Sequence, residues 1–233
     1  AYFRKRAAAV GQKSLDMERQ ALQAMMTHLT QELPSGEVLE IVHSLKEKKL
    51  SSRSYTSEQI YLISSHQSDK NGLATLIAYN AGLRSHELFT ISELQQRQPN
   101  IRPVSAKKFM GRSGQAYTVQ GKGGLIREIR LSTDLAENLE TTRLPEPIKI
   151  TDRGVHYDQF YAIAAGQSWS RSFSTASTRT LGWSAGSHGT RHSYAQERME
   201  ELQSLGCHYA EALEIVSQEM GHFRPEITEV YLR

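Results

Sequence analysis

The segment 102–131 constrains the fold most, because its residue pattern differs from that of the rest of the chain. Residues 116–120 and 125–131 alternate between apolar and polar side chains, as strands do. Between them lies a Gly-Lys-Gly-Gly sequence at 121–124, whose glycines suit a tight hairpin turn. The sequence therefore predicts one antiparallel hairpin here.

Elsewhere, apolar residues recur mostly at helical spacing. A capping box of Thr56 and Gln59 predicts the start of one helix. Further helices are expected over 14–33, 38–45, about 71–80, from His86, and in the Glu-rich stretch 197–219, with only helices after residue 131 and a Ser/Thr/Gly-rich loop near 166–187. The expected fold is mainly α with a small antiparallel β-sheet, an α+β fold.

A basic, serine-containing stretch at 46–53 resembles a linker and divides the chain into two parts. Residues 1–53 hold two expected helices, and residues 54–233 hold the hairpin and the remaining helices. The larger part is long enough to bury a core of its own. We therefore expect a small helical domain followed by a larger α+β domain.

Positive charge is concentrated around the hairpin. The 233-residue chain carries 28 Lys and Arg against 25 Asp and Glu, a net charge of only +3. Residues 102–130 hold seven of these cations and one acid, Glu128, so this segment alone carries +6. Such a concentration is typical of contact with a phosphate backbone. The candidate DNA-binding residues are Arg102, Lys107, Lys108, Arg112, Arg127 and Arg130.

Other features exclude several classes of protein. A single cysteine, Cys207, excludes an internal disulfide framework. No apolar run reaches the roughly 20 residues of a membrane helix, and the N-terminus lacks a secretory signal. No acidic cluster offers a site for a hard cation, so we expect no metal. A cytoplasmic protein with no membrane partner is expected.

Five short segments hold residues suited to one reaction. Three carry basic side chains: Arg84 at a helix break, Lys122 in the hairpin turn, and His188 with Arg191 three residues later. The last two are the Met-Gly-His sequence at 220–222 and the Thr-Glu-Val-Tyr sequence at 228–231. The candidate catalytic residues are Arg84, Lys122, His188, Arg191, His222 and Tyr231.

In this order, the five segments resemble those of the tyrosine recombinases, or phage integrases, over roughly residues 56–231. The resemblance implies that Tyr231 attacks a DNA phosphodiester and forms a 3′-phosphotyrosyl intermediate, and that Lys122 protonates the leaving 5′-oxygen. It also implies double-stranded DNA as the partner, two subunits on a site and four in the synapse, no cofactor, and a nucleoid-associated enzyme of a bacterial or phage mobile element.

The side chains suit this chemistry. A phenol has a pKa of about 10, so a tyrosine nucleophile needs help near neutral pH. Arg84 and Arg191 offer planar, two-point hydrogen bonding to the non-bridging oxygens of a phosphate. His188 and His222 can exchange protons or donate hydrogen bonds.

The chain departs from the family pattern in three places. The long separation of Arg84 and Lys122 predicts an additional DNA-contacting element at about 95–116. Residues 1–53 are shorter than the family's DNA-clamping core-binding domain, of which we expect only the last two helices. The sequence stops two residues after Tyr231, so we expect the family's C-terminal tail to be missing.

Three alternatives stay open on the sequence alone: a type IB topoisomerase, a DNA-binding protein of this fold that does not cleave, and a helical interaction module with a basic hairpin. Two histidines in or near the five segments are expected to have ordinary roles, His86 on a helix surface and His192 in a local hydrogen bond. The Glu-rich stretch 197–219 is expected to be a solvated helix face.

Overall fold

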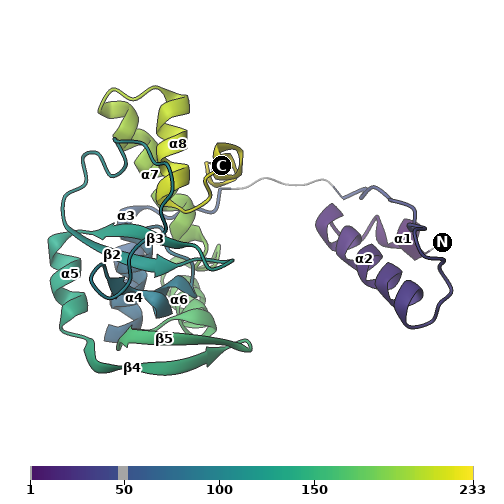
Figure 1. Cartoon of the computed structure of the whole chain (residues 1–233), viewed down its shortest axis with the longest axis horizontal. Helices are drawn as coiled ribbons and strands as arrows, with labels where there is room; N and C mark the ends of the chain where they lie inside the picture. The colour runs from purple at the N-terminus through teal and green to yellow at the C-terminus, as the bar shows by residue number, and fades with distance from the viewer. Residues whose placement is uncertain (1, 47–51, 233) are drawn as a thin grey trace. The chain divides into compact units, whose positions relative to one another are not determined.

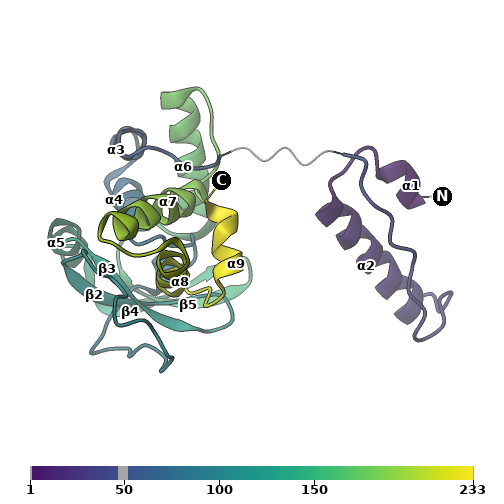
Figure 2. The ribbon, with the colours of Figure 1, turned by 90° about the horizontal axis from the view of Figure 1, so that it is seen from above.

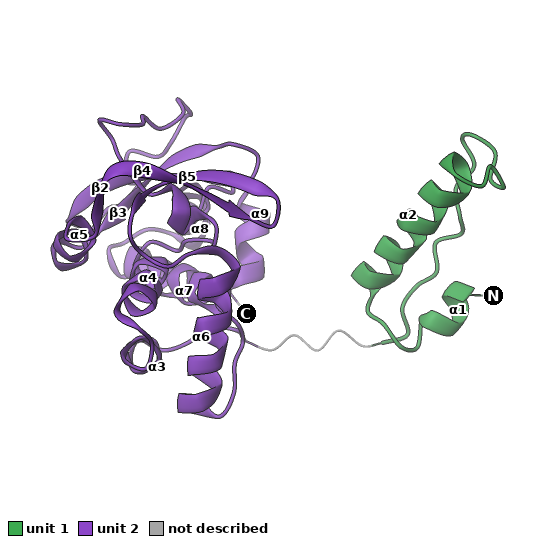
Figure 3. Ribbon diagram, turned by 90° about the horizontal axis from the view of Figure 1, so that it is seen from below, with its two compact units in different colours: residues 1–51 green, residues 52–233 purple. Residues whose placement is uncertain are grey.

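The computed structural model describes residues 2–46 and 52–232, and the chain divides into two compact units, Ala1–Ser51 and Ser52–Arg233 (Figure 3). Most of the expected linker, residues 47–51, lies outside the described residues. No helix in the described ranges combines the length and the apolar character needed to cross a membrane.

Over residues 2–46, the first unit contains two helices, α1 (Tyr2–Arg6) and α2 (Gln12–His28). The helix expected over 38–45 is wrong, because these residues form no regular element and run beside α2 (Figure 2). Their backbone finds partners elsewhere: the Ser44 amide donates to Gln12 Oε1 at 2.8 Å and the Leu45 amide to the Ala7 carbonyl at 2.9 Å. A helix of only two turns is marginally stable on its own, so these hydrogen bonds outweigh the helical pattern of the segment.

The second unit is built around helices and two small antiparallel sheets, which confirms the expected α+β class (Figure 1). Its helical elements are α3 (Ser57–Ser65), α4 (Asp69–Asn80), η1 (Glu87–Thr90), α5 (Thr133–Glu140), α6 (Gly166–Leu181), α7 (Gly189–Ser204), α8 (Tyr209–Glu219), α9 (Pro225–Thr228) and η2 (Glu229–Tyr231). The predicted capping box of α3 is confirmed, since Thr56 Oγ1 accepts from the Gln59 amide at 3.3 Å and Gln59 Oε1 accepts from the Thr56 amide at 3.0 Å.

The predicted hairpin supplies two of the strands of a three-stranded sheet. Strands β1 (Ser92–Glu93), β2 (Gln115–Gln120) and β3 (Ile126–Leu131) pair in this order, and Gln120 lies opposite Ile126 at the turn. Burial alternates along β3, where Arg127 shares the buried face with Ile129 and Leu131. On this face of the sheet, the Arg127 side chain is buried.

Two elements differ from expectation after residue 131. A second sheet pairs β4 (Arg143–Asp152) with β5 (Val155–Tyr161), where only helices were expected. The expected loop at 166–187 is mostly helix α6, which buries Trp169, Phe173 and Ala176 at helical spacing. Packing of these three side chains outweighs the weak helix propensity of the Ser and Thr residues around them.

The buried side chains form two clusters. The larger one lies between the three-stranded sheet and helices α3 to α6, with Tyr117, Trp169 and Phe173 among its members. The smaller one lies between α7 and α8 and includes Leu202, Val216 and Tyr231. The last helical turns of the chain are therefore packed onto α7 and α8, the helices next to His188 and His222.

Candidate active site

The turn after α4 places Arg84. Gly82 has a φ of +59°, and a Cβ at this position would lie 2.6 Å from Cδ1 of Tyr194, so only glycine fits. The Gly82 carbonyl accepts a hydrogen bond from Nη1 of Arg191. The turn thereby joins two segments that lie far apart in the sequence, and it brings their arginines to one place.

A buried carboxylate, Glu87, holds three guanidinium groups together. Its Oε1 accepts from Arg84 Nη1 at 2.8 Å, and its Oε2 accepts from Arg127 Nη2 at 2.9 Å. Arg191 Nη1 lies 3.7 Å from Oε2. The sequence pattern did not single out Glu87, and it predicted Arg127 as a DNA-binding residue, whereas the structure places both in the interior. The alternation of Arg127 with Ile129 and Leu131 was the signal that could have placed it inside.

The charge balance of this cluster favours an anion. Burial alone would raise the pKa of Glu87, but the guanidinium groups of Arg127, Arg191 and Arg84 outweigh it and lower the pKa to about 2. One negative charge therefore faces three positive ones. The Nε atoms of Arg127 and Arg191 are buried, and neither has a hydrogen-bond partner among the described residues. A phosphate group matches this excess of positive charge and donors.

The ring of Tyr231, in η2, lies against this cluster. It stacks on His222 at 5.1 Å between centroids, and the His192 and His188 rings lie at 4.9 and 5.4 Å. Cζ of Arg191 is 5.4 Å from the ring centroid. In the described part of the chain nothing hydrogen-bonds the Tyr231 hydroxyl, so this group is available to a substrate.

The hydrogen bonds of His222 define its tautomer. Arg191 Nη2 can only donate, so His222 Nε2 accepts at 3.0 Å, and Nδ1 carries the proton and donates to Thr228 Oγ1 at 3.0 Å. Burial, followed by the nearby charges of Arg191 and Arg84, lowers the pKa of His222 to about 3. Burial and Arg191 likewise lower the pKa of His188 to about 4. Both rings are therefore neutral near pH 7.

His192 has the local role that the sequence predicts. Its ring is buried, and Nδ1 lies 3.2 Å from the Tyr231 carbonyl oxygen. Because a carbonyl can only accept, the Nδ1–H donates. His192 thus holds the backbone of the tyrosine segment and stands beside its ring.

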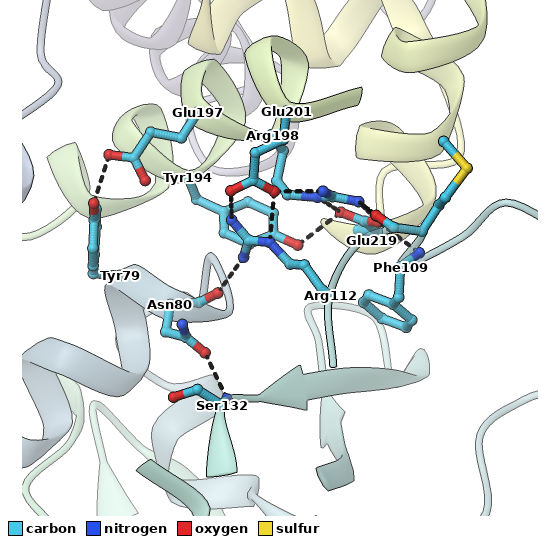
Figure 4. A network of polar contacts seen from close by, with 11 residues as sticks. Tyr79, Asn80, Phe109, Arg112, Ser132, Tyr194, Glu197, Arg198, Glu201 and Glu219 are labelled. Atoms are coloured by element: carbon cyan, nitrogen blue, oxygen red, sulfur yellow. Dashed lines mark hydrogen bonds and ion pairs between the residues drawn. The ribbon is translucent and has the colours of Figure 1, made fainter. Parts of the chain in front are cut away.

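A polar network behind the site fixes α7 to α8 (Figure 4). The Glu219 carboxylate accepts from Arg198 Nε and Nη2, both at 2.9 Å, and from the Tyr194 hydroxyl at 2.8 Å. The Glu219 backbone carbonyl accepts from Arg127 Nη1 at 2.6 Å. The expectation of a solvated acidic face at 197–219 is wrong for Glu219, which is only 1% exposed because it neutralises the buried Arg198.

No family model matches the sequence, and no curated protein matches it either. Solved structures do match. XerH site-specific recombinase bound to difH substrate, a pre-cleavage complex, has a TM-score of 0.60 at 16% identity, covering all of this chain and 65% of that chain. The Tn1549 transposon integrase in complex with transposon right end DNA has a TM-score of 0.53 at 14% identity, covering 96% of this chain and 76% of that one. XerA recombinase has a TM-score of 0.51 at 12% identity, with 97% and 72% covered.

The chain has the tyrosine recombinase fold. The fold that the five sequence segments implied is thereby confirmed. The chain spans about two thirds of the XerH chain that it matches.

Within this tyrosine recombinase fold, five of the six candidate catalytic residues gather around the Glu87 cluster and the Tyr231 ring: Arg84, His188, Arg191, His222 and Tyr231. Lys122 is exposed in the hairpin turn, without a described residue that pairs with its ammonium group. The turn nevertheless starts at the cluster, because a Cβ on Gly121 would lie 3.2 Å from Glu87 Oε1 and 3.9 Å from Arg84 Nη1.

The candidate DNA-binding residues do not form one uniform surface in the tyrosine recombinase fold. Arg127 is buried at the site, and Arg112 donates to Glu201 and to the Asn80 carbonyl (Figure 4). The others lie outside this interior: Lys107 pairs with Glu211, Lys108 and Arg130 lie over the Phe109 ring, and Arg102 lies 5.1 Å from the Phe223 ring. DNA contact by this set stays a prediction.

The loop at 95–116 has a structural role that the sequence did not indicate. The Phe109 amide donates to Glu219 Oε1 at 2.9 Å, and the Ser105 amide donates to Gln218 Oε1 at 2.8 Å. The loop is therefore held to the end of α8, next to the Met-Gly-His segment that contains His222. In the described ranges, no group of three or more His, Cys, Asp or Glu is placed to hold a metal ion.

We predict that the free energy of unfolding falls as the pH drops from 7 to 4.5. The unfolded chain takes up protons at two histidines whose folded pKa values are lowered, His188 and His222, so acid favours the unfolded state. The expected loss is about 5 kcal/mol, roughly half from each histidine. Urea unfolding at several pH values measures it. The double variant His188→Gln/His222→Gln should lose less, whereas the exposed control His28→Gln should match the wild type; equal pH dependence in all three would contradict the prediction.

Proposed function

We propose that this chain is a site-specific DNA recombinase of the tyrosine type, integrase-like in its chemistry. The Tyr231 hydroxyl gives up its proton and its oxygen attacks a DNA phosphorus. A bond between this oxygen and the phosphorus forms, which makes the phosphotyrosine, while the bond from phosphorus to the 5′-oxygen breaks. The leaving oxygen takes a proton and departs as a 5′-hydroxyl. Attack by the 5′-hydroxyl of another strand reverses the step and joins the two strands.

One observation carries this proposal. The ring of Tyr231 lies within about 5.5 Å of His188, His222 and the guanidinium carbon of Arg191, beside a buried cluster with excess positive charge. The phosphorane formed during attack gains negative charge, and fixed cations stabilise it without a change of geometry. A tyrosine that served only to fill the core would need no such surroundings.

Each side chain has a role in the proposed step. Arg84 and Arg191 bind the non-bridging oxygens, and Glu87 fixes the arginines in place. The neutral His188 and His222 can accept a proton from the tyrosine or donate a hydrogen bond to the phosphate. Lys122, on the hairpin turn that starts at the cluster, protonates the leaving 5′-oxygen.

The proposed partners are double-stranded DNA and further copies of the chain, two on a site and four in the synapse. The similarity to XerH bound to difH substrate and to an integrase in complex with transposon right end DNA supports DNA as the substrate. Residues 1–53 would belong to a DNA-clamping core-binding domain. No metal or cofactor takes part in the proposed step, and the enzyme acts on DNA in the cytoplasm.

The test uses a nicked suicide substrate. Bound sequences are first selected from a random duplex library, and the preferred site is then rebuilt with a nick that lets the cleaved end diffuse away. A covalent adduct should form both in EDTA and in magnesium, and mass spectrometry should locate the nucleotide on Tyr231. Absence of an adduct on DNA that the protein binds would contradict cleavage. Strand exchange between two duplexes, rather than relaxation of a supercoiled circle alone, separates a recombinase from a type IB topoisomerase.

A further inference from the structure

A cavity lies beside the Tyr231 cluster but apart from it, between the turn of the β2–β3 hairpin and strand β5. Its volume is about 650 Å³. Of the described residues, Lys122 lines it, whereas Tyr231, His188 and His222 do not. This volume is in the range of pockets that hold small molecules or single nucleotides, and it is far too small for a duplex.

Several polar side chains around this cavity make no hydrogen bond to another described residue. Lining side chains without a hydrogen bond in the described part of the chain are the Gln120 amide, the His86 imidazole and the Tyr157 hydroxyl. His86, at the N-cap of η1, is half-buried. Polar groups that converge on a cavity unpaired are typical of a ligand site, because a ligand supplies the missing hydrogen bonds.

The charged residues of the cavity favour a phosphate. Arg97 is half-buried and donates to Thr118 Oγ1 and to the Thr90 and Thr118 carbonyls, with no carboxylate partner in the described residues. Lys122 adds a second positive charge. Asp158, exposed on β5, is the one acidic side chain among the described lining residues. The cations therefore exceed the acids.

Aromatic rings supply a surface for a base. Tyr157 stacks on Phe89 with 5.1 Å between centroids and 20° between planes, which holds its ring in place. Phe160 also lines the cavity. Bases of any sequence stack on aromatic side chains, and amides such as Gln120 can bond to a base edge.

The position of the cavity links it to the cleavage point. Gly121 and Lys122 line it, and Gly121 is the residue whose Cβ would come within 3.2 Å of Glu87 Oε1. His86, another lining residue, is two positions after Arg84. When a DNA phosphate binds the arginine cluster, the next nucleotide of the same strand can therefore reach the cavity.

We propose that this cavity binds one unpaired nucleotide of the DNA strand next to the cleavage point, with its base on Tyr157, its base edge at Gln120 and its phosphate between Arg97 and Lys122. The inference rests on the proposed function, because it assumes that DNA lies on the arginine cluster. It adds to that function a pocket that favours DNA whose pairing is already broken.

The test compares a blunt 20-base-pair duplex with the same duplex carrying a 5′ tail of four thymidines. Fluorescence anisotropy at 0.15 M salt should show about tenfold tighter binding of the tailed duplex, as one stacked base provides. Tyr157→Ala should remove the gain, and Gln120→Ala, at an exposed position, should reduce it. The control Lys149→Ala, exposed on β4 and outside the cavity, should keep the gain. With 5-iodouracil in the tail, irradiation should crosslink the DNA to Tyr157 or Phe160.

The outcomes separate the two proposals. Equal affinity for both duplexes, a gain that survives both cavity substitutions, or a crosslink mapped to another face would overturn the nucleotide pocket and leave the recombinase proposal standing. Failure of the wild type to bind either duplex would count against DNA as the substrate altogether. Unchanged affinity of both variants for the blunt duplex shows that they are folded.

Discussion

Replacing Tyr231 by phenylalanine should abolish the covalent adduct with the suicide substrate and leave the fold and the DNA affinity as they are. The hydroxyl has no hydrogen-bond partner among the described residues, so its removal strands no buried polar group. The ring contacts with His222, His192 and His188 are kept. We therefore expect the free energy of unfolding to change by less than about 0.5 kcal/mol. Denaturing gels, anisotropy and urea unfolding measure the three quantities.

A matched control for this substitution is Tyr209→Phe, at an exposed tyrosine in α8. It should keep full adduct formation, which excludes a general effect of losing a phenol. An adduct that persists in Tyr231→Phe would show that another side chain is the nucleophile. Loss of DNA binding in the same variant would instead mean that the hydroxyl contacts DNA before cleavage.

Replacing Glu87 by glutamine should destabilise the protein strongly, although the side chain keeps its size. The change removes the carboxylate charge that faces Arg127 and Arg191, whose side chains are 2% and 0% exposed. Removing one partner of a buried ion pair costs about 3–5 kcal/mol, because the remaining charge is left uncompensated. Adduct formation should fall at least about a hundredfold, since the arginines lose their fixed positions. Urea unfolding and single-turnover cleavage measure the two effects.

The same substitution at Glu128 is the control, because its pair with Arg130 is partly exposed. A surface pair of this kind contributes at most about 1 kcal/mol. Inorganic phosphate should restore part of the stability of Glu87→Gln by supplying a negative charge to the cluster, and it should do little for Glu128→Gln. Equal losses in the two variants would contradict a central role for Glu87.

The sequence predicted the parts of the molecule that depend on local patterns. The hairpin follows from alternation around a glycine-rich turn, and the start of α3 follows from Thr56 and Gln59. The order of the five segments pointed to the fold before any contact was visible. The segments also contain the residues that the structure brings together around Tyr231. Their spacing within each segment places them on one face of a helix or in a turn.

The parts that depend on tertiary packing could not be predicted in this way. Helix α6 forms in a stretch rich in Ser and Thr because Trp169 and Phe173 find a core to fill. The region 38–45 has helical spacing but stays irregular, since its backbone bonds to α2 and to Ala7. The role of Glu87 needs the positions of three arginines from separate segments, which no local pattern contains.

The cluster around Glu87 and Tyr231 collects residues from 82–87, Arg127, Arg191 and 222–231. Contacts between such distant parts form late, after the intervening chain has been ordered. During synthesis, the basic hairpin therefore leaves the ribosome before the segment 222–231 that completes the cluster. Under the proposed function, a chain interrupted before Tyr231 can occupy DNA but lacks the group that breaks a strand.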